Sequence, residues 1–129
     1  MENILRTVLI DWLTADPLLA AALNAVTEEV PTRTTAPWLG IAASASTDWS
    51  TKDRKGREVR LALELHTRGE EPGETGTLTG LIEDRIASLP PAQTGLRIVS
   101  TTFLRARVEQ RARGERAVLL EYRFRLLAN

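Results

Sequence analysis

The chain of 129 residues has no cysteine, a single histidine and only 5% aromatic residues. The lack of cysteine excludes disulfide scaffolds, thiol nucleophiles, iron–sulfur clusters and cysteine-based zinc sites. A single histidine, His66, excludes a histidine pair for a metal ion or a proton relay, so we expect no metal and no cofactor. No run approaches the roughly 18 apolar residues that cross a bilayer, so we expect no membrane contact. The acidic start, Met1-Glu2-Asn3, is unlike a secretory signal and favours assembly in the cytoplasm.

Net charge of either sign is also missing, because 17 basic side chains balance 17 acidic ones. Overall attraction to nucleic acid is therefore not expected. The distribution is uneven, since residues 1–50 carry 2 basic and 6 acidic side chains, whereas residues 97–129 carry 8 and 3. Hydrophobic residues make up 43% of the chain, which is enough to bury a core without metals or disulfides. We expect a single domain over residues 1–129.

Hydrophobic periodicity predicts three helical segments. Apolar residues spaced by four positions predict an amphipathic helix over residues 2–15. An Asp-Pro pair then predicts a short helix from Pro17 to about Leu23. A further apolar stripe over residues 78–89 predicts a helix that ends at a Pro-Pro pair. Two glycines near its start leave room for close approach to a sheet, namely Gly76 and Gly80.

Alternation of apolar and other residues predicts four strands, over residues 38–46, 58–66, 96–110 and 117–127. In the first strand the expected apolar face is Leu39, Ile41, Ala43 and Ala45. In the third it is Leu104, Ala106 and Val108. A glycine-containing turn joins the last two strands into an antiparallel hairpin. The predicted fold is therefore α+β: a roughly four-stranded antiparallel sheet with two main helices packed on one face.

Two polar, glycine-containing loops are predicted, at residues 49–57 and 68–77, and both are expected to be mobile until they contact a partner. His66 is expected on the polar face of its strand, without a functional role. Acid pairs occur at Glu28-Glu29 and Glu70-Glu71, but flexible segments do not hold carboxylates in the geometry of acid–base catalysis. No nucleotide-binding, hydrolase or zinc-protease motif occurs, so we expect no catalytic residue and no enzyme.

The arginine-rich strands admit two interpretations. Fifteen of the 17 basic residues are arginine, which fits a preference for arginine codons on a solvated sheet face. Alternatively, a set of arginines contacts the acidic N-terminal part of a neighbouring subunit, because the guanidinium fork pairs with carboxylates. That set is Arg105, Arg107, Arg123 and Arg125. Opposite charges on the N-terminal and C-terminal parts of one chain favour head-to-tail rings of copies over two-fold dimers.

A small nucleic-acid-binding module is a competing hypothesis for the same arginines. Modules that stack bases place aromatic residues among basic ones on an exposed sheet face. Here Tyr122 and Phe124 fall in the apolar phase of the last strand, which alternates with Arg123 and Arg125. A steep loss of binding with salt would be needed to support this hypothesis.

Several short segments, taken in order, carry a family resemblance. They are Leu9 to Leu18 with its Ala-Asp-Pro-Leu ending, Val30-Pro31, Ala36 to Gly40, Asp48-Trp49-Ser50-Thr51, the strand at Val59–Leu65, and Leu120-Glu121-Tyr122-Arg123-Phe124-Arg125. Their order and the chain length resemble the small tail completion or tail terminator proteins of siphophages and gene transfer agents. The resemblance covers nearly the whole chain.

The resemblance implies a structural protein in the tail of a phage or gene-transfer-agent particle. It would form a ring with copies of itself, expected to be a hexamer, that caps the head-proximal end of the tail tube. Its partners would be the major tail tube protein and a neck or connector protein, while DNA passes through the lumen without specific binding. By position, the resemblance assigns the 49–57 loop to subunit or tube contacts, through Trp49, Lys52, Arg54, Lys55 and Arg57. A head–tail connector component is the alternative within the same setting, and the basic loop leaves contact with passing DNA open.

Overall fold

The computed structural model describes residues 1–69 and 72–129 as an α+β fold with three helices and a six-stranded sheet. The helices are α1 (Glu2–Thr14), α2 (Pro17–Ala22) and α3 (Pro72–Ala87). The strands are β1 (Ala25–Thr27), β2 (Trp38–Asp48), β3 (Gly56–Arg68), β4 (Ala92–Gln93), β5 (Leu96–Gln110) and β6 (Glu115–Ala128). A single 3₁₀ turn, Ala112–Gly114, joins β5 to β6.

The sheet corrects the prediction of four antiparallel strands. Its order is β1-β2-β3-β6-β5-β4, in which the four long strands are antiparallel as predicted. The short β1 pairs parallel to β2, so the sheet is mixed, and β4 adds an antiparallel partner to the start of β5. Strands of three and two residues are too short to show an alternating pattern, which is why the sequence did not reveal them.

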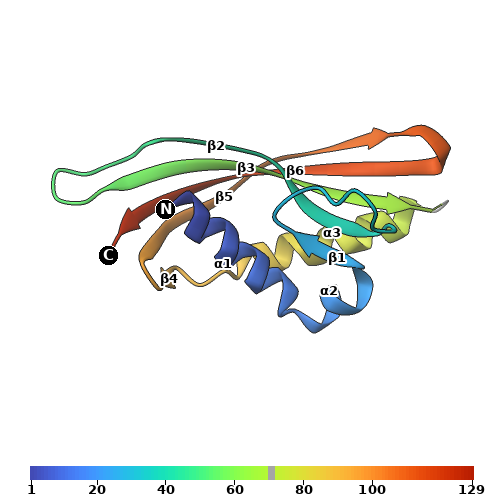
Figure 1. Cartoon of the computed structure of the whole chain (residues 1–129), viewed down its shortest axis with the longest axis horizontal. Coiled ribbons are helices and arrows are strands. Elements are labelled where there is room, and N and C mark those ends of the chain that lie inside the picture. Colours follow the sequence, from blue (N-terminus) through green and yellow to red (C-terminus); the bar gives the residue numbers. More distant parts are fainter. Residues whose placement is uncertain (70–71) are drawn as a thin grey trace.

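The helices all lie on one side of the curled sheet, as predicted (Figure 1). From α1, the fully buried side chains Leu5, Leu9 and Leu13 recur every four residues and pack into the core. The Asp16 carboxylate caps α2 by accepting hydrogen bonds from the two backbone amides at positions 18 and 19. The long strands extend past the helices at both ends, so one hairpin, β2–β3, projects at one end and another, β5–β6, at the opposite end (Figure 1).

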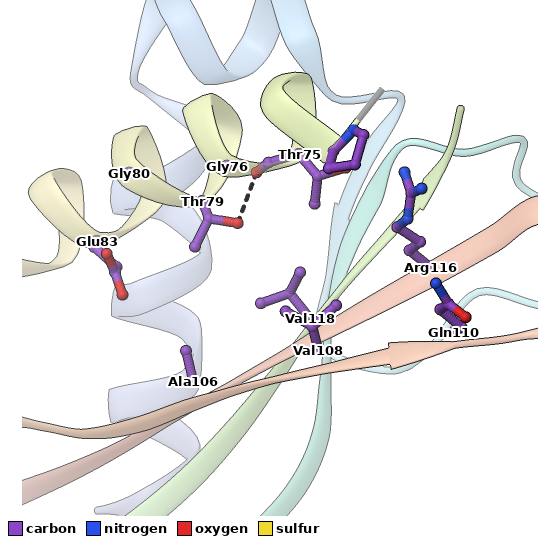
Figure 2. Close-up of a pocket in the computed structure, with 11 residues that line it drawn as sticks. Thr75, Gly76, Thr79, Gly80, Glu83, Ala106, Val108, Gln110, Arg116 and Val118 are labelled. Carbon is purple, nitrogen blue, oxygen red and sulfur yellow. Dashed lines mark hydrogen bonds between the residues drawn. The ribbon is translucent and has the colours of Figure 1, made fainter. Parts of the chain in front are cut away.

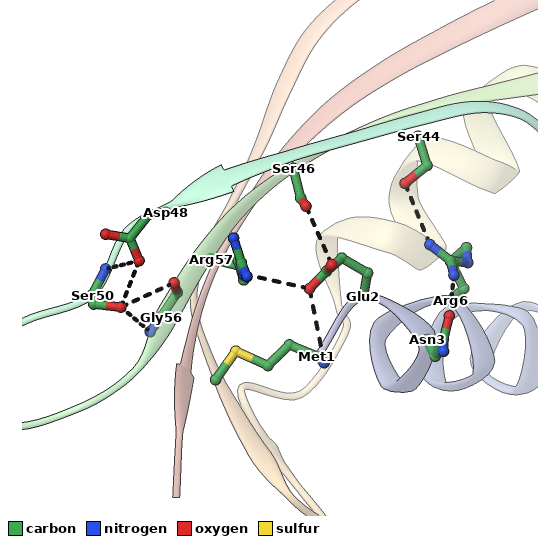
Figure 3. A network of polar contacts seen from close by, with 10 residues as sticks. All are labelled: Met1, Glu2, Asn3, Arg6, Ser44, Ser46, Asp48, Ser50, Gly56 and Arg57. Carbon is green, nitrogen blue, oxygen red and sulfur yellow. Dashed lines mark hydrogen bonds and ion pairs between the residues drawn. The ribbon is translucent and has the colours of Figure 1, made fainter.

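A β-bulge in β2 overturns the predicted face of this strand. Ile41 pairs with Leu63, but the register shifts there, and Ser44 and Ser46 then stand opposite the core residues of β3. These two serines therefore face α1, where Ser44 accepts a hydrogen bond from Arg6 and Ser46 donates one to Glu2 (Figure 3). The predicted apolar positions Ala43 and Ala45 are displaced to the outer face and are exposed.

Two further bulges in β5 have the same effect, because the register shifts between Ile98 and Ser100 and again between Phe103 and Arg105. Phe103 pairs with Tyr122 and lies on the helix side, whereas Leu104 falls in the shifted segment and is exposed. The prediction that Leu104 belongs to the apolar face is therefore wrong. The later positions, Ala106 and Val108, return to the predicted phase.

His66 and the second predicted loop also differ from expectation. His66 is buried, and its ring stacks on Trp38 with centroids 4.9 Å apart. Its Nε2 lies 3.0 Å from a carboxylate oxygen of Glu115. Residues 72–77 form the first turns of α3 instead of a loop: Pro72 stands at the first helical position, which proline favours, and Glu74 lies in the first turn. Glu70 and Glu71 lie outside the described residues.

Candidate functional site

The tip of the β2–β3 hairpin, which we call the basic tip, consists of residues 52–55. Its cationic side chains Lys52, Arg54 and Lys55 are all exposed. None of the three forms an ion pair within residues 1–69 and 72–129. The other two predicted loop residues point elsewhere. Arg57 lies 3.9 Å from Glu2 on the helix side, and the half-buried Trp49 packs beneath the Arg125 guanidinium, 5.5 Å from the ring centre.

Hydrogen bonds join the residues at the base of this hairpin (Figure 3). The Ser50 hydroxyl donates to Asp48 at 2.6 Å and accepts from the Gly56 amide at 3.0 Å. The side-chain hydrogen bond from Ser50 is the largest cause of a lowered pKa of the Asp48 carboxyl, and the Ser50 backbone amide and the charge of Arg57 lower it further. Only glycine fits at position 56, because an added Cβ would lie 2.4 Å from the Trp49 carbonyl oxygen. The tip is therefore presented from a rigid base.

The four predicted interface arginines do share one face, the outer face that points away from the helices. Arg105 and Arg107 are the most exposed, at 61% and 54%, and each already pairs with a carboxylate of this chain, Glu121 and Glu109 respectively. Arg123 and Arg125 both lie near Glu58, at 3.9 and 3.1 Å. Each of the four arginines thus has a carboxylate within 4 Å in its own chain, across strands for Arg105, Arg123 and Arg125 and within β5 for Arg107.

The outer face keeps an excess of positive charge. Arg60 and Arg123 stand directly opposite each other on β3 and β6, a like-charge pair that by itself destabilises a sheet. The Arg105 side chain lowers the pKa of Glu121, chiefly through their hydrogen bond, so that carboxyl stays ionised and offsets part of the repulsion. The acidic N-terminal part is likewise engaged within the chain, since Arg6 bonds Glu28 at 2.9 Å.

A trough between α3 and the β5–β6 hairpin is the feature that sequence reasoning missed (Figure 2). It has a volume of about 430 Å³ and is lined by Pro72, Thr75, Gly76, Thr79, Gly80 and Glu83 of α3 and by Ala106, Val108, Gln110, Arg116 and Val118 of the strands. The two glycines were expected to let α3 approach the sheet. Instead, no atom lies within 4 Å of where their Cβ atoms would be, so they face open space.

The floor of the trough is apolar and open. Val108 is 63% exposed although its cross-strand partner Val118 is only 2% exposed. Phe103, farther along β5, is 47% exposed and touches the buried Tyr122 edge-on, with ring centres 5.5 Å apart. The sequence shows only the small residues at the start of α3, and these do not reveal that the β5–β6 hairpin extends past this helix.

The part of the chain that the structure describes contains no group of three or more histidine, cysteine, aspartate or glutamate side chains placed to hold a metal ion. No helix among these residues combines the length and apolarity needed to span a bilayer. Tyr122 and Phe124 are buried on the helix side, which removes them as a platform for stacking bases.

Comparisons with known proteins identify the fold and the family of this chain. In a solved structure described as the virion of a native gene transfer agent (GTA) particle, one chain matches with a TM-score of 0.81 and 22% identity, over 99% of this chain and 97% of that chain. That match establishes the fold. No curated protein matches in sequence. The family model described as tail completion protein gp17 matches residues 7–127. The chain therefore belongs to the tail completion protein gp17 family and is a structural protein of a phage-type virion tail, as the sequence resemblance indicated.

Proposed function

We propose that this protein is a tail terminator, a ring of identical subunits that caps the head-proximal end of the tail tube. The ring, a hexamer, stops polymerisation of the tube and presents the surface on which the head is joined. The observation that carries the proposal is family membership over residues 7–127, together with a subunit whose two projecting ends differ in chemistry. Unlike ends that complement each other build closed rings when the rotation between copies closes.

The partners follow from this position. Beside copies of itself, the protein would contact the major tail tube protein on one side of the ring and a neck or connector protein on the other. DNA would pass through the lumen without specific binding, which a net charge of zero favours because few phosphates would be held. The role requires binding and no bond-making step, so we propose no enzymatic activity.

We assign the subunit and tube contacts to two surfaces, the outer-face arginines and the basic tip with Trp49 behind it. Arg105 and Arg107 are the arginines that a partner reaches first, because more than half of each side chain is exposed. The planar guanidinium of each can pair with further carboxylates on a neighbouring subunit through its remaining N–H groups.

Charge reversal tests this assignment. Changing Arg105 and Arg107 together to glutamate should abolish ring assembly at physiological salt, while the circular dichroism spectrum of the monomer stays unchanged. The matched control is Arg33→Glu, an exposed arginine outside the sheet, which should leave assembly intact. The measurement is the mass in solution, or in the presence of tail tubes, by analytical ultracentrifugation and negative-stain microscopy. An unchanged oligomer mass in the double variant would contradict the assigned surface.

Particles that lack the protein distinguish the terminator from the alternatives. A terminator predicts tails of uncontrolled length that fail to join heads. Tails of normal length that fail to join heads would indicate a connector component. Normal particles would refute both roles, and salt-sensitive binding of oligonucleotides by the isolated protein would indicate a nucleic-acid-binding module.

A further inference from the structure

The trough continues along α3 beyond the part drawn in Figure 2. A second hollow of about 350 Å³ adjoins the first through Glu83, and its lining adds Asp84, Ala87, Thr101, Phe103 and Tyr122. Together they form one channel with α3 as its wall and the inner side of β5 as its floor. The trough thus consists of both hollows.

The wall of the trough is acidic and its acids are free. Neither Glu83 nor Asp84 forms an ion pair with any described residue of the chain. Burial raises the pKa of Tyr122 to about 12, and the negative charges of Glu83 and Asp84 add to this rise. The phenol therefore stays neutral, and the trough offers two carboxylates above an apolar floor. Its lining also includes one cation, Arg116, which donates a hydrogen bond to the Gly69 carbonyl and lies across the hollow from Glu83 (Figure 2).

The opposite end of the molecule offers the complement. The basic tip carries three cations, Lys52, Arg54 and Lys55, against one acid, Asp53, and the cations are unpaired among the described residues. In Figure 1 this tip ends one side of the long axis, whereas the β5–β6 hairpin and the start of α3 lie at the other side. The tip cannot reach the trough of its own chain, so a complementary contact requires two molecules.

We propose that the trough receives the basic tip of the next copy in the ring, with Lys52, Arg54 and Lys55 paired to Glu83 and Asp84. The inference rests on the proposed ring and specifies how its neighbours interlock. The alkyl stems of the lysines and the arginine cover the apolar floor around Val108, and their charged ends reach the carboxylates on the wall. The glycine pair Gly76 and Gly80 supplies clearance between the flanking side chains of α3, because no atom lies within 4 Å of where their Cβ atoms would be.

Two observations favour a second copy as the occupant. The charges are complementary, with free cations on the tip and free carboxylates on the wall. The two surfaces also lie at opposite ends of one rigid chain, so each copy offers one of each and the contact is head-to-tail. The hydrogen bonds at the hairpin base keep the tip in place before docking, which reduces the entropy that docking must remove.

Cross-linking tests the contact directly, because the chain has no cysteine of its own. One preparation carries Asp53→Cys and another carries Thr79→Cys, a trough residue whose side chain bonds only the backbone of its own helix. Mixed under ring-forming conditions and treated with a short thiol cross-linker, they should give a covalent dimer that neither preparation gives alone. A mixture of Asp53→Cys with Arg33→Cys is the control and should give none.

Charge exchange provides the second measurement. Glu83→Lys with Asp84→Lys should lose ring assembly, and so should Lys52→Glu with Arg54→Glu and Lys55→Glu, while both keep the wild-type circular dichroism spectrum. A chain that carries all five changes should regain assembly.

If wild-type rings form, but neither set weakens them and the cysteines do not cross-link, this contact is wrong and the ring proposal stands. If the wild type forms no ring alone or on tail tubes, the ring proposal fails and the contact fails with it.

Discussion

The two hairpins that project from opposite ends of the sheet are built from the same secondary structure and differ in almost everything else. The β2–β3 hairpin is fixed at its base by polar bonds around Ser50 and ends in cations. The β5–β6 hairpin turns through Arg113 and Gly114, both with positive φ, and exposes an apolar inner side that includes Val108. Because the long strands extend past the helices at both ends of the sheet, each subunit has two projecting hairpins, one with a basic tip and one with an exposed apolar side.

The largest effect should come from the two glycines of these hairpins. Gly56→Ala should destabilise the fold by about 3 kcal/mol, because the new Cβ would press on backbone oxygens at positions 49 and 126, which cannot move aside. Gly114→Ala should cost only about 1 kcal/mol, since its positive φ is unfavourable for alanine but the surrounding space is open. Urea unfolding of both variants measures the difference. Equal losses of unfolding free energy in the two variants would contradict the expectation that the two glycines differ in how well alanine replaces them.

The next effect separates the two sides of the β5–β6 hairpin. Val118→Ala should cost about 2 kcal/mol, because it removes two buried methyl groups from the core. Val108→Ala, directly opposite on β5, should change stability by less than about 0.5 kcal/mol because that side chain is mostly exposed. Thermal unfolding of the two monomeric variants is the measurement. A loss at Val108 as large as that at Val118 would mean that the trough is closed in the free subunit.

A smaller effect is expected from the anchor of the β5–β6 hairpin. Arg111 donates a hydrogen bond at 3.0 Å to Glu64, whose carboxylate is buried. Arg111→Ala should cost about 1–2 kcal/mol, because the carboxylate loses its closest cationic partner. The control is Arg113→Ala, in the same turn, which forms no ion pair with the described residues. Chemical denaturation of both variants tests the pair, and an equal loss in both would show that the turn conformation matters more than the ion pair.

The smallest effect concerns the anchor of the β2–β3 hairpin. Ser50→Ala should raise the pKa of Asp48 toward its ordinary value of 3.8, because the hydroxyl bond is the largest cause of the lowering. A lowered pKa means that ionised Asp48 stabilises the fold above that ordinary value and that this contribution is lost as the pH falls through the folded pKa. In Ser50→Ala the contribution should therefore be smaller at neutral pH. NMR titration of the Asp48 carboxyl measures the shift, with Thr51→Ala as a control that should leave it unchanged.

The fold could be predicted from the sequence wherever one local pattern governs the chain. The leucines of α1, the Asp16 cap and the four long strands were predicted from spacing alone and are confirmed. The bulges in β2 and β5 were not predictable, because the residues around each of them fit either phase: small side chains follow Ile41 in β2, and the neighbours Phe103 and Leu104 in β5 are both apolar. The burial of His66 depends on stacking with Trp38, which is distant in sequence and has no local signal.

The candidate surfaces were predictable to different degrees. Alternation placed the four arginines on one face, and the structure confirms that placement. Their carboxylate partners lie on neighbouring strands, so the pairing depended on register, which the sequence did not supply. The trough depends on where α3 ends relative to β5, a relation in space between two elements that no linear pattern encodes.

The two bulges in β5 also affect how the free edge of the sheet behaves. β4 covers only the first residues of β5, so the remaining outer margin of this long strand offers unpaired amides and carbonyls to any other extended chain. Straight margins of this kind template fibril growth, and kinks along them prevent it. The interruptions in β5 thus make this margin a poor template for further strands, which should protect the free subunit from edge-to-edge aggregation.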